Sequence, residues 1–359
     1  MTTPQRLRRA GLAAAAALVI GGSGVAIGAA ATDSSASGTT AAATATATPG
    51  PATPGPASYA SVVRQVLPSV VLIRTESGLG SGVVLDRSGN IVTNAHVAGN
   101  ATKFQVQVAG DTAPRSARLV GTYPPDDLAV IRADNPAGLQ PATFGDSDKV
   151  QAGDVVLAIG NPLGLSGSVT QGIISATDRA VTEPSEDGSP AATLPGAIQT
   201  SAPINPGNSG GALVSTSGQV VGIPTLAAGS PQGGGQAQGI GFAIPSNLAR
   251  DIATQIIDTG HVTNSHRAAL GAEVATVLGA DGSTGGVGVV AVTSGGGAER
   301  AGLRPGDVIK SVGSAQTPDT TALTQALAAA EPGDKVTVTI SRAGQDQDVQ
   351  VTLGELPGS

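Results

Sequence analysis

The stretch Asn205-Pro206-Gly207-Asn208-Ser209-Gly210-Gly211 is the most informative part of the chain. A serine flanked by glycines in a tight turn can expose its hydroxyl while nearby backbone N–H groups converge on one point. Acyl transfer needs this arrangement, because an oxyanion has to be stabilised beside the nucleophile. Taken alone, the run is equally compatible with an ordinary surface turn, so its interpretation depends on partners elsewhere in the sequence.

A serine hydroxyl is a weak nucleophile at neutral pH and needs a base within hydrogen-bond reach, most often a histidine. The chain has three histidines. His261 and His266 fall in a predicted connection between domains, whereas His96 ends the strand-like run that starts at Asn90. Although a lone histidine at a strand end is usually structural, the preceding Thr93-Asn94-Ala95 and the downstream Ser209 favour His96 as the base.

The base in turn needs a carboxylate that fixes its tautomer and stabilises the imidazolium. Asp127 precedes the apolar run Leu128–Ile131, and its neighbour Asp126 is the rival. Spacing does not separate the two, although a residue at the entry of a strand is better placed to point inward. The chain order His, Asp, Ser is that of chymotrypsin-like enzymes.

Short apolar runs separated by Gly, Asn, Asp and Pro dominate the sequence from Tyr59 onward. Most are four or five residues long and rich in Val and Ile, which is typical of an all-β barrel or sandwich. The runs are Val70–Ile73, Gly82–Leu85, Ile91–Val92, Leu128–Ile131, Val155–Ile159 and Val220–Ile223. Residues Ser246–Thr259 carry apolar side chains at helical spacing and predict a closing amphipathic helix. A domain boundary follows near Gly260.

The last part of the chain predicts a small α+β module. Strand signals occur at Val287–Val292, Val308–Val312, Val336–Ile340 and Val349–Leu353. Between the second and third, Asp319 is placed to cap a helix that carries Leu323 and Leu327 on one face.

The N-terminus has the pattern of an export signal. Arg6, Arg8 and Arg9 precede an uncharged run, Gly11–Ala30, with small residues at its end. Residues 1–31 are therefore predicted to be a signal peptide or a membrane anchor, with a slight preference for a cleaved signal. Residues 32–58 are almost entirely Ala, Thr, Ser, Gly and Pro, which predicts a disordered tether.

Composition excludes several classes of function. The net charge of -7 and the pI near 4.9 argue against nucleic-acid binding. Without cysteine, the chain forms no disulfide, thiolate metal site or cysteine nucleophile. With only two Tyr, three Phe and no Trp, the core has to be built from Val, Ile, Leu and Ala.

An ordered series of motifs resembles the HtrA/DegP family of trypsin-fold serine proteases. These motifs are Gly80-Ser81-Gly82, Thr93–Val97, Asp127–Ile131, Gly145–Lys149, Ala158–Gly164, Val169–Ser175, Ile204–Gly211 and Gly241–Pro245. The resemblance implies a mostly β protein in which residues 59–258 form a chymotrypsin-like double β-barrel of six strands each.

The same resemblance implies roles for individual residues. It selects Asp127 over Asp126 as the partner of His96, and it places the oxyanion hole at the N–H groups of Gly207 and Ser209. No metal or cofactor is implied. Pro203 and Pro224 depart from the family pattern. They lie in segments expected to wall the specificity pocket, so its shape is left open.

The C-terminal module, residues 266–356 after a linker at 259–265, resembles a PDZ domain. Ala301–Ile309 carries this resemblance, and Leu270-Gly271-Ala272 is similar to a carboxylate-binding loop. A PDZ groove holds a peptide C-terminus as an added strand. Leu323 and Leu327 are expected to flank that groove.

The resemblance thus implies an exported endopeptidase of quality control or stress response that cleaves unfolded or regulatory proteins and recognises C-terminal peptides. A homo-oligomer, by resemblance a trimer, is implied as well, although the expected aromatic contacts near the start of the domain are reduced to Tyr59. The alternative is a non-proteolytic chaperone or peptide-binding scaffold. An intact Ser-His-Asp set argues against it, because a binding module does not need all three residues.

Overall fold

The computed structural model describes residues 58–76, 78–161, 167–182, 193–205, 207–229, 236–278 and 283–357. Nearly all of the predicted export segment and tether, residues 1–57, lies outside these ranges. Ser58 is described, and its Oγ accepts a hydrogen bond from the Ser61 N–H at the start of helix α1 (Tyr59–Val66). No helix within the described ranges has the length and apolar character that crossing a membrane would need.

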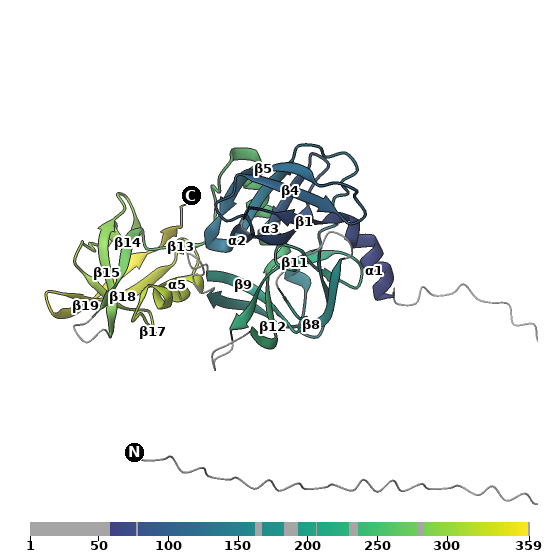
Figure 1. Cartoon of the computed structure of the whole chain (residues 1–359). Helices are drawn as coiled ribbons and strands as arrows, with labels where there is room; N and C mark the ends of the chain where they lie inside the picture. The colour runs from purple at the N-terminus through teal and green to yellow at the C-terminus, as the bar shows by residue number, and fades with distance from the viewer. Residues whose placement is uncertain are drawn as a thin grey trace, which may run out of the picture. The chain divides into compact units, whose positions relative to one another are not determined.

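The first half of residues 59–258 is a closed antiparallel barrel (Figure 1). Its strands are β1 (Val70–Arg74), β2 (Leu79–Val84), β3 (Asn90–Thr93), β4 (Lys103–Val108), β5 (Arg115–Tyr123) and β6 (Leu128–Ala133), in the order β1-β2-β3-β6-β5-β4. Three short helical segments join this part: η1 (Leu67–Ser69), α2 (Ala95–Ala98) after β3, and η2 (Pro124–Asp126) before β6. The last two of these carry His96 and the turn into Asp127.

A second closed antiparallel barrel follows. Its strands are β7 (Val155–Gly160), β8 (Ser168–Thr182), β9 (Thr193–Thr200), β10 (Ala212–Ser215), β11 (Val220–Gly229) and β12 (Gln236–Pro245), in the order β10-β11-β12-β9-β8-β7. The connection between the barrels contains η3 (Ser147–Lys149). The predicted double barrel of six strands each is confirmed.

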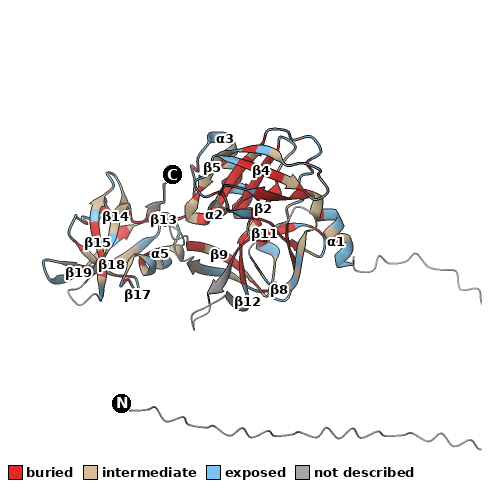
Figure 2. Ribbon diagram, in the orientation of Figure 1, coloured by how far each residue is buried: buried red, intermediate tan, exposed pale blue. Residues whose placement is uncertain are grey.

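One hydrophobic cluster contains residues of both barrels. The buried residues of their strands are red in Figure 2. The cluster combines Val83 and Val130 of the first barrel with Leu157 and Ile244 of the second. Since aromatic residues are scarce, most of this core is aliphatic, and each fully buried Val, Leu or Ile contributes about 1.5–3 kcal/mol.

Helix α3 (Ser246–Thr259) has the bounds that its apolar spacing predicts. Its buried face presents Ala249, Ile252, Ala253 and Ile256 to the same cluster. The helix ends at Gly260, which adopts the left-handed conformation common at C-caps.

The C-terminal module is a small α+β domain. Its elements are β13 (Ala268–Ala269), β14 (Ala272–Leu278), β15 (Thr284–Val292), α4 (Gly297–Arg300), β16 (Val308–Val312), β17 (Ala315–Gln316), α5 (Thr320–Ala328), β18 (Lys335–Arg342), β19 (Gln345–Thr352) and β20 (Gly354–Glu355). The main sheet has the order β14-β15-β16-β18-β19, while β13 pairs with β20. The Asp319 carboxylate accepts from the Ala322 N–H at 2.8 Å and caps α5, as predicted.

Candidate active site

The turn that carries Ser209 is fixed by the second barrel and by a residue of the first. Within the turn, the Gly211 N–H donates to the Asn208 carbonyl at 2.9 Å, and the Gly210 N–H donates to the Pro224 carbonyl of β11 at 2.9 Å. Across the barrels, Ser81 of β2 donates from its N–H to the Ser209 carbonyl at 2.9 Å and from its Oγ to the Gly207 carbonyl at 2.6 Å. The nucleophile candidate therefore depends on contacts from both barrels.

Gly210 cannot be exchanged for another residue without disturbing this turn. Its φ is +77°, and a Cβ there would lie 2.2 Å from the Ser81 carbonyl oxygen and 2.4 Å from Thr93 Oγ1. Backbone packing at this point is therefore too close for any side chain.

His96, in α2 after β3, and Asp127, directly before β6, come together in the first barrel. The Asp127 Oδ2 lies 2.8 Å from His96 Nδ1, and Oδ1 accepts from the His96 backbone N–H at 2.9 Å. The Asp127 side chain is 3% exposed and that of His96 is 36% exposed. Since an ionised carboxylate only accepts, Nδ1 carries the proton in this contact.

Thr225 of β11 adds a contact from the second barrel. Its Oγ1 donates to Asp127 Oδ2 at 2.5 Å, and its carbonyl accepts from Ser209 Oγ at 3.0 Å. In this structure the Ser209 hydroxyl therefore donates to a main-chain carbonyl of the second barrel. Nothing in the sequence indicates Thr225, which lies 98 positions from Asp127.

The two rival carboxylates face different partners. Asp127 contacts His96, whereas the buried Asp126 receives a hydrogen bond from Arg267 Nη1 at 2.9 Å. Burial raises the pKa of Asp126 from 3.8 to about 6, and the Arg267 guanidinium acts in the opposite direction. The structure thus brings Asp127, and not Asp126, to the imidazole.

The predicted oxyanion-hole residues lie in the same buried turn. Gly207 has a φ of +102°, and its carbonyl is occupied by Ser81. Within the described residues, neither the Gly207 nor the Ser209 N–H donates to an acceptor in the protein.

The predicted peptide-binding residues gather at one end of the C-terminal module. The loop Leu270-Gly271-Ala272 leads into β14, the edge strand of the sheet. Leu270 and Leu323 are each 3% exposed and belong to the module's core, against which Ala272 and Leu327 also pack. Leu270 and Leu323 thus support this region from the inside, while Leu327 is only partly buried.

Thr276 of β14 and Thr320 of α5 form polar contacts in the C-terminal module that nothing in the sequence indicates. Thr276 Oγ1 of β14 accepts from the Thr320 N–H at 3.1 Å and lies 3.2 Å from Thr320 Oγ1. These contacts join the edge strand to the start of α5.

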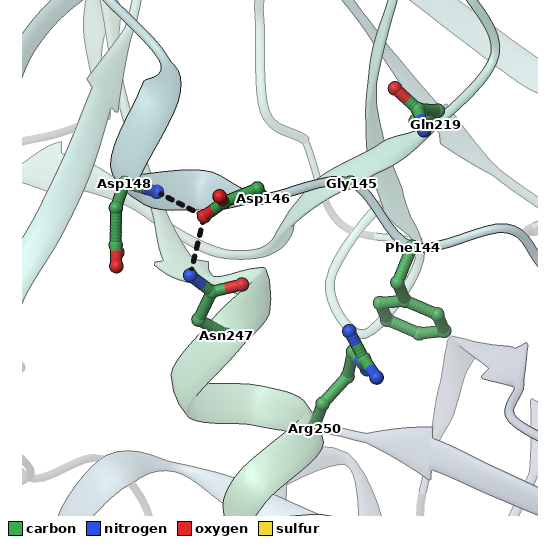
Figure 3. A pocket seen from close by; sticks show the side chains of 7 residues that line it. All are labelled: Phe144, Gly145, Asp146, Asp148, Gln219, Asn247 and Arg250. Carbon is green, nitrogen blue, oxygen red and sulfur yellow. Dashed lines mark hydrogen bonds between the residues drawn. The ribbon is translucent and has the colours of Figure 1, made fainter.

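A separate open hollow lies beside the N-terminal end of α3 (Figure 3). It is lined by Phe144, Gly145, Asp146, Asp148, Gln219, Asn247 and Arg250. None of His96, Asp127 and Ser209 lines it. Hydrogen bonds from Asn247 and Lys149 and from the Asp148 N–H lower the pKa of Asp146. Within the described ranges, no group of three His, Asp or Glu side chains is arranged to hold a metal ion.

Comparison with known proteins gives consistent matches to both domains. Residues 80–223 match the trypsin-like peptidase domain family, and residues 264–353 match the PDZ domain family. The chain is 40% identical over 317 residues to serine protease PepD of Mycobacterium tuberculosis, covering 83% of this chain and 66% of PepD. It is 36% identical to the periplasmic pH-dependent serine endoprotease DegQ of Escherichia coli, covering 82% of this chain and 70% of DegQ.

Solved structures agree. The HtrA-type protease AlgW with a decapeptide is 35% identical, with a TM-score of 0.55 over 84% of this chain and 99% of that one. The serine endoprotease from Yersinia pestis gives the same identity, TM-score and coverage. The chain spans between about half and 70% of the length of the curated relatives it matches.

Fold, site geometry and matches together define a trypsin-like serine protease domain followed by a PDZ domain. The chain belongs to the HtrA/DegP family of serine proteases.

Proposed function

We propose that the protein is a serine endopeptidase that uses Ser209 as nucleophile, His96 as general base and Asp127 as the orienting carboxylate. The observation that supports this most directly is the 2.8 Å contact between His96 Nδ1 and Asp127 Oδ2 at the edge of the barrel that also fixes the Ser209 turn. The resemblance of the whole motif series to serine proteases points the same way.

The mechanism follows from these positions. His96 Nε2 takes the proton of Ser209 Oγ as the hydroxyl attacks the substrate carbonyl, and the resulting oxyanion is held by the N–H groups of Gly207 and Ser209. His96 then gives the proton to the leaving amine and activates the water that hydrolyses the acyl-enzyme. Asp127 stabilises the imidazolium through both steps. Neither a metal nor a cofactor takes part in this scheme.

We further propose that residues 59–258 form the protease domain, 259–265 a linker and 266–356 the PDZ domain, with peptide C-termini held at Leu270-Gly271-Ala272 beside Leu323 and Leu327. The exposed edge of β14 supports this, since a PDZ ligand is added as a strand. Substrates would be unfolded or regulatory proteins. A homotrimer, and export by residues 1–31 as cleaved signal or retained anchor, complete the proposal. Relatives named periplasmic support an extracytoplasmic location.

Degradation of unfolded casein by the purified chain tests the activity. We expect fragments from the wild type and none from Ser209→Ala, with identical circular dichroism and thermal unfolding of the two proteins. Casein cleavage that survives in Ser209→Ala would contradict the assignment of the nucleophile. If the wild type cleaves nothing and both proteins suppress casein aggregation equally, the non-proteolytic chaperone is the correct function.

A further inference from the structure

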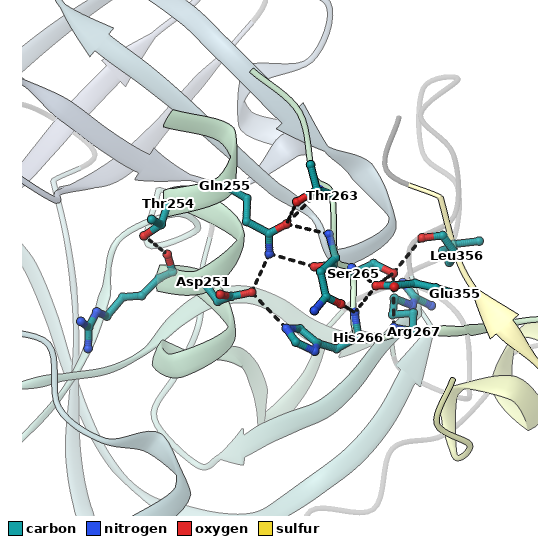
Figure 4. A network of polar contacts seen from close by, with 11 residues as sticks. Asp251, Thr254, Gln255, Thr263, Ser265, His266, Arg267, Glu355 and Leu356 are labelled. Carbon is teal, nitrogen blue, oxygen red and sulfur yellow. Dashed lines mark hydrogen bonds and ion pairs between the residues drawn. The ribbon is translucent and has the colours of Figure 1, made fainter. Parts of the chain in front are cut away.

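The segment Val262–Arg267, between α3 and β13, is fastened to the protease domain. The Val262 side chain is 1% exposed and belongs to the cluster that joins the two barrels. Gln255 of α3 accepts at Oε1 from the N–H groups of Thr263 and Asn264, each at 2.8 Å (Figure 4). The position of this segment is therefore set by the helix that closes the protease domain.

The same segment is also tied to the end of the PDZ domain. The Ser265 N–H donates to Glu355 Oε1 at 2.5 Å, and its Oγ donates to the Leu356 carbonyl at 2.8 Å. The Leu356 N–H donates in turn to the Arg267 carbonyl at 2.7 Å. The Arg267 N–H donates to Ser265 Oγ at 3.3 Å, so both backbone polar groups of Arg267 are hydrogen-bonded.

The side chain of Arg267 contacts the turn that precedes Asp127. Its Nη1 donates to the Pro125 carbonyl at 2.6 Å and to Asp126 Oδ1 at 2.9 Å. Arg267 is 8% exposed and Asp126 is fully buried. Asp126 Oδ2 has no hydrogen-bond partner in the described part of the chain, so the contact with Arg267 is the main compensation for burying this carboxylate.

This turn determines how Asp127 is oriented. Asp127 follows η2 directly and has φ 51° and ψ 43°, in the left-handed region that is unfavourable for a residue with a Cβ. Such a conformation persists only where the surroundings fix it. On one side, the Ala95 N–H and Asn94 Nδ2 bind the Asp127 carbonyl, each at 3.1 Å. On the other side, Arg267 holds the two residues before it.

We propose that Arg267 is a positioning residue for the catalytic carboxylate: its bonds to Pro125 and Asp126 keep Asp127 turned toward His96. The proposal rests on the proposed role of Asp127. It makes the geometry of the catalytic acid dependent on the segment that joins the two domains. Displacing this segment would therefore weaken catalysis without touching any residue that contacts the substrate.

The test compares three variants of the full chain. Arg267→Met removes both donors and the charge at similar volume. Arg267→Lys keeps a cation, and since both bonds leave from the single nitrogen Nη1, one ammonium group can replace them. Arg342→Met is the matched control, because Arg342 makes a similar contact at 2.7 Å to the buried Asp307 inside the PDZ domain, away from the catalytic turn.

The readouts are kcat and KM for a reporter peptide, thermal unfolding, and the low-field proton NMR signal of the His96 Nδ1 proton bound to Asp127. In Arg267→Met we expect kcat to fall about tenfold with KM within about twofold, and the NMR signal to shift or broaden. Arg267→Lys should recover most of kcat, and Arg342→Met should keep the wild-type kcat and signal.

A folded Arg267→Met protein with wild-type kcat and NMR signal would overturn the proposal, as would an equal loss in Arg342→Met. If Arg267→Met does not fold, the double variant Asp126→Leu/Arg267→Met, which removes both buried charges, takes its place under the same expectations. Failure of the proposed function is distinguishable, because the wild type would then hydrolyse nothing or hydrolysis would survive Ser209→Ala. Hydrolysis that needs Ser209 but ignores Arg267 rejects only the positioning role.

Discussion

Replacing Asp127 with asparagine removes one of two oxygens from a side chain that uses both. Oδ1 accepts from the His96 backbone N–H at 2.9 Å, while Oδ2 accepts from His96 Nδ1 and from Thr225 Oγ1. If the asparagine oxygen keeps the Oδ1 position, its NH₂ group faces Nδ1 and forces the imidazole proton onto Nε2. If the amide is flipped, two N–H donors oppose each other near the His96 backbone.

The first orientation abolishes the lone pair that has to accept the Ser209 proton. We therefore expect kcat to fall by about 10⁴-fold, as an orienting carboxylate changed to an amide does in this type of site. The free energy of unfolding should fall by about 1–3 kcal/mol, because the two charge-assisted bonds to Oδ2 give way to bonds from a neutral amide. Reporter-peptide hydrolysis and denaturant unfolding measure the two effects.

Asp126→Asn is the matched comparison, because its amide oxygen can still accept from Arg267. We expect it to keep kcat within about tenfold of the wild type. If the large loss of kcat occurred in Asp126→Asn and the small one in Asp127→Asn, the assignment of the catalytic carboxylate would be wrong.

Three further predictions concern stability, pH and specificity. Gly210→Ala should lose about 2–4 kcal/mol of unfolding free energy and most activity, because its Cβ would meet the Ser81 carbonyl oxygen. Gly196→Ala is the control, since Gly196 has a φ of +65° and open space around it. It should lose only about 1 kcal/mol when both variants are unfolded in urea. Burial raises the pKa of Asp126 from 3.8 to about 6, so the folded state binds its proton more tightly than the unfolded chain does. The stabilisation of the folded state by this proton is complete below about pH 4 and is lost as the pH rises through 6. Unfolding free energies of the wild type and Asp126→Asn that run parallel over this pH range would contradict the prediction. The protein should cleave its substrates after small aliphatic residues, because residues 201–208 contain no acidic side chain to pair with a cationic substrate side chain. Preferred cleavage after Arg in a peptide library would refute this specificity.

Much of the fold could be predicted because it depends on local pattern. Short Val- and Ile-rich runs predicted six of the barrel strands, β1, β2, β3, β6, β7 and β11, and the spacing of apolar residues predicted both ends of α3. The closure of the strands into two barrels was implied by the family resemblance. Helix α1 was missed, although Ser58 caps it and Val62 and Val66 form its buried face. Strand β14 was missed because it is a half-exposed edge strand without a continuous apolar run.

The site was predictable only in part, for a similar reason. Ser209 and His96 stand in distinctive local contexts, but the choice between Asp126 and Asp127 rested on resemblance until the geometry was known. Thr225 and Arg267 contact the Asp126–Asp127 pair from 98 and 141 positions away. Nothing in the spacing of a single sequence encodes such contacts.

The distribution of the site over both barrels has a physical consequence. His96 and Asp127 come from the first barrel, Ser209 and Thr225 from the second, and Ser81 crosses between them to hold the Ser209 turn. The hydrogen bonds that align the site therefore form only when the shared aliphatic cluster has docked the barrels. We expect a change in that docking, or in the Arg267 contact, to alter the geometry of the candidate site before it unfolds either barrel. Hydrogen-bond directions change over smaller displacements than hydrophobic contacts do.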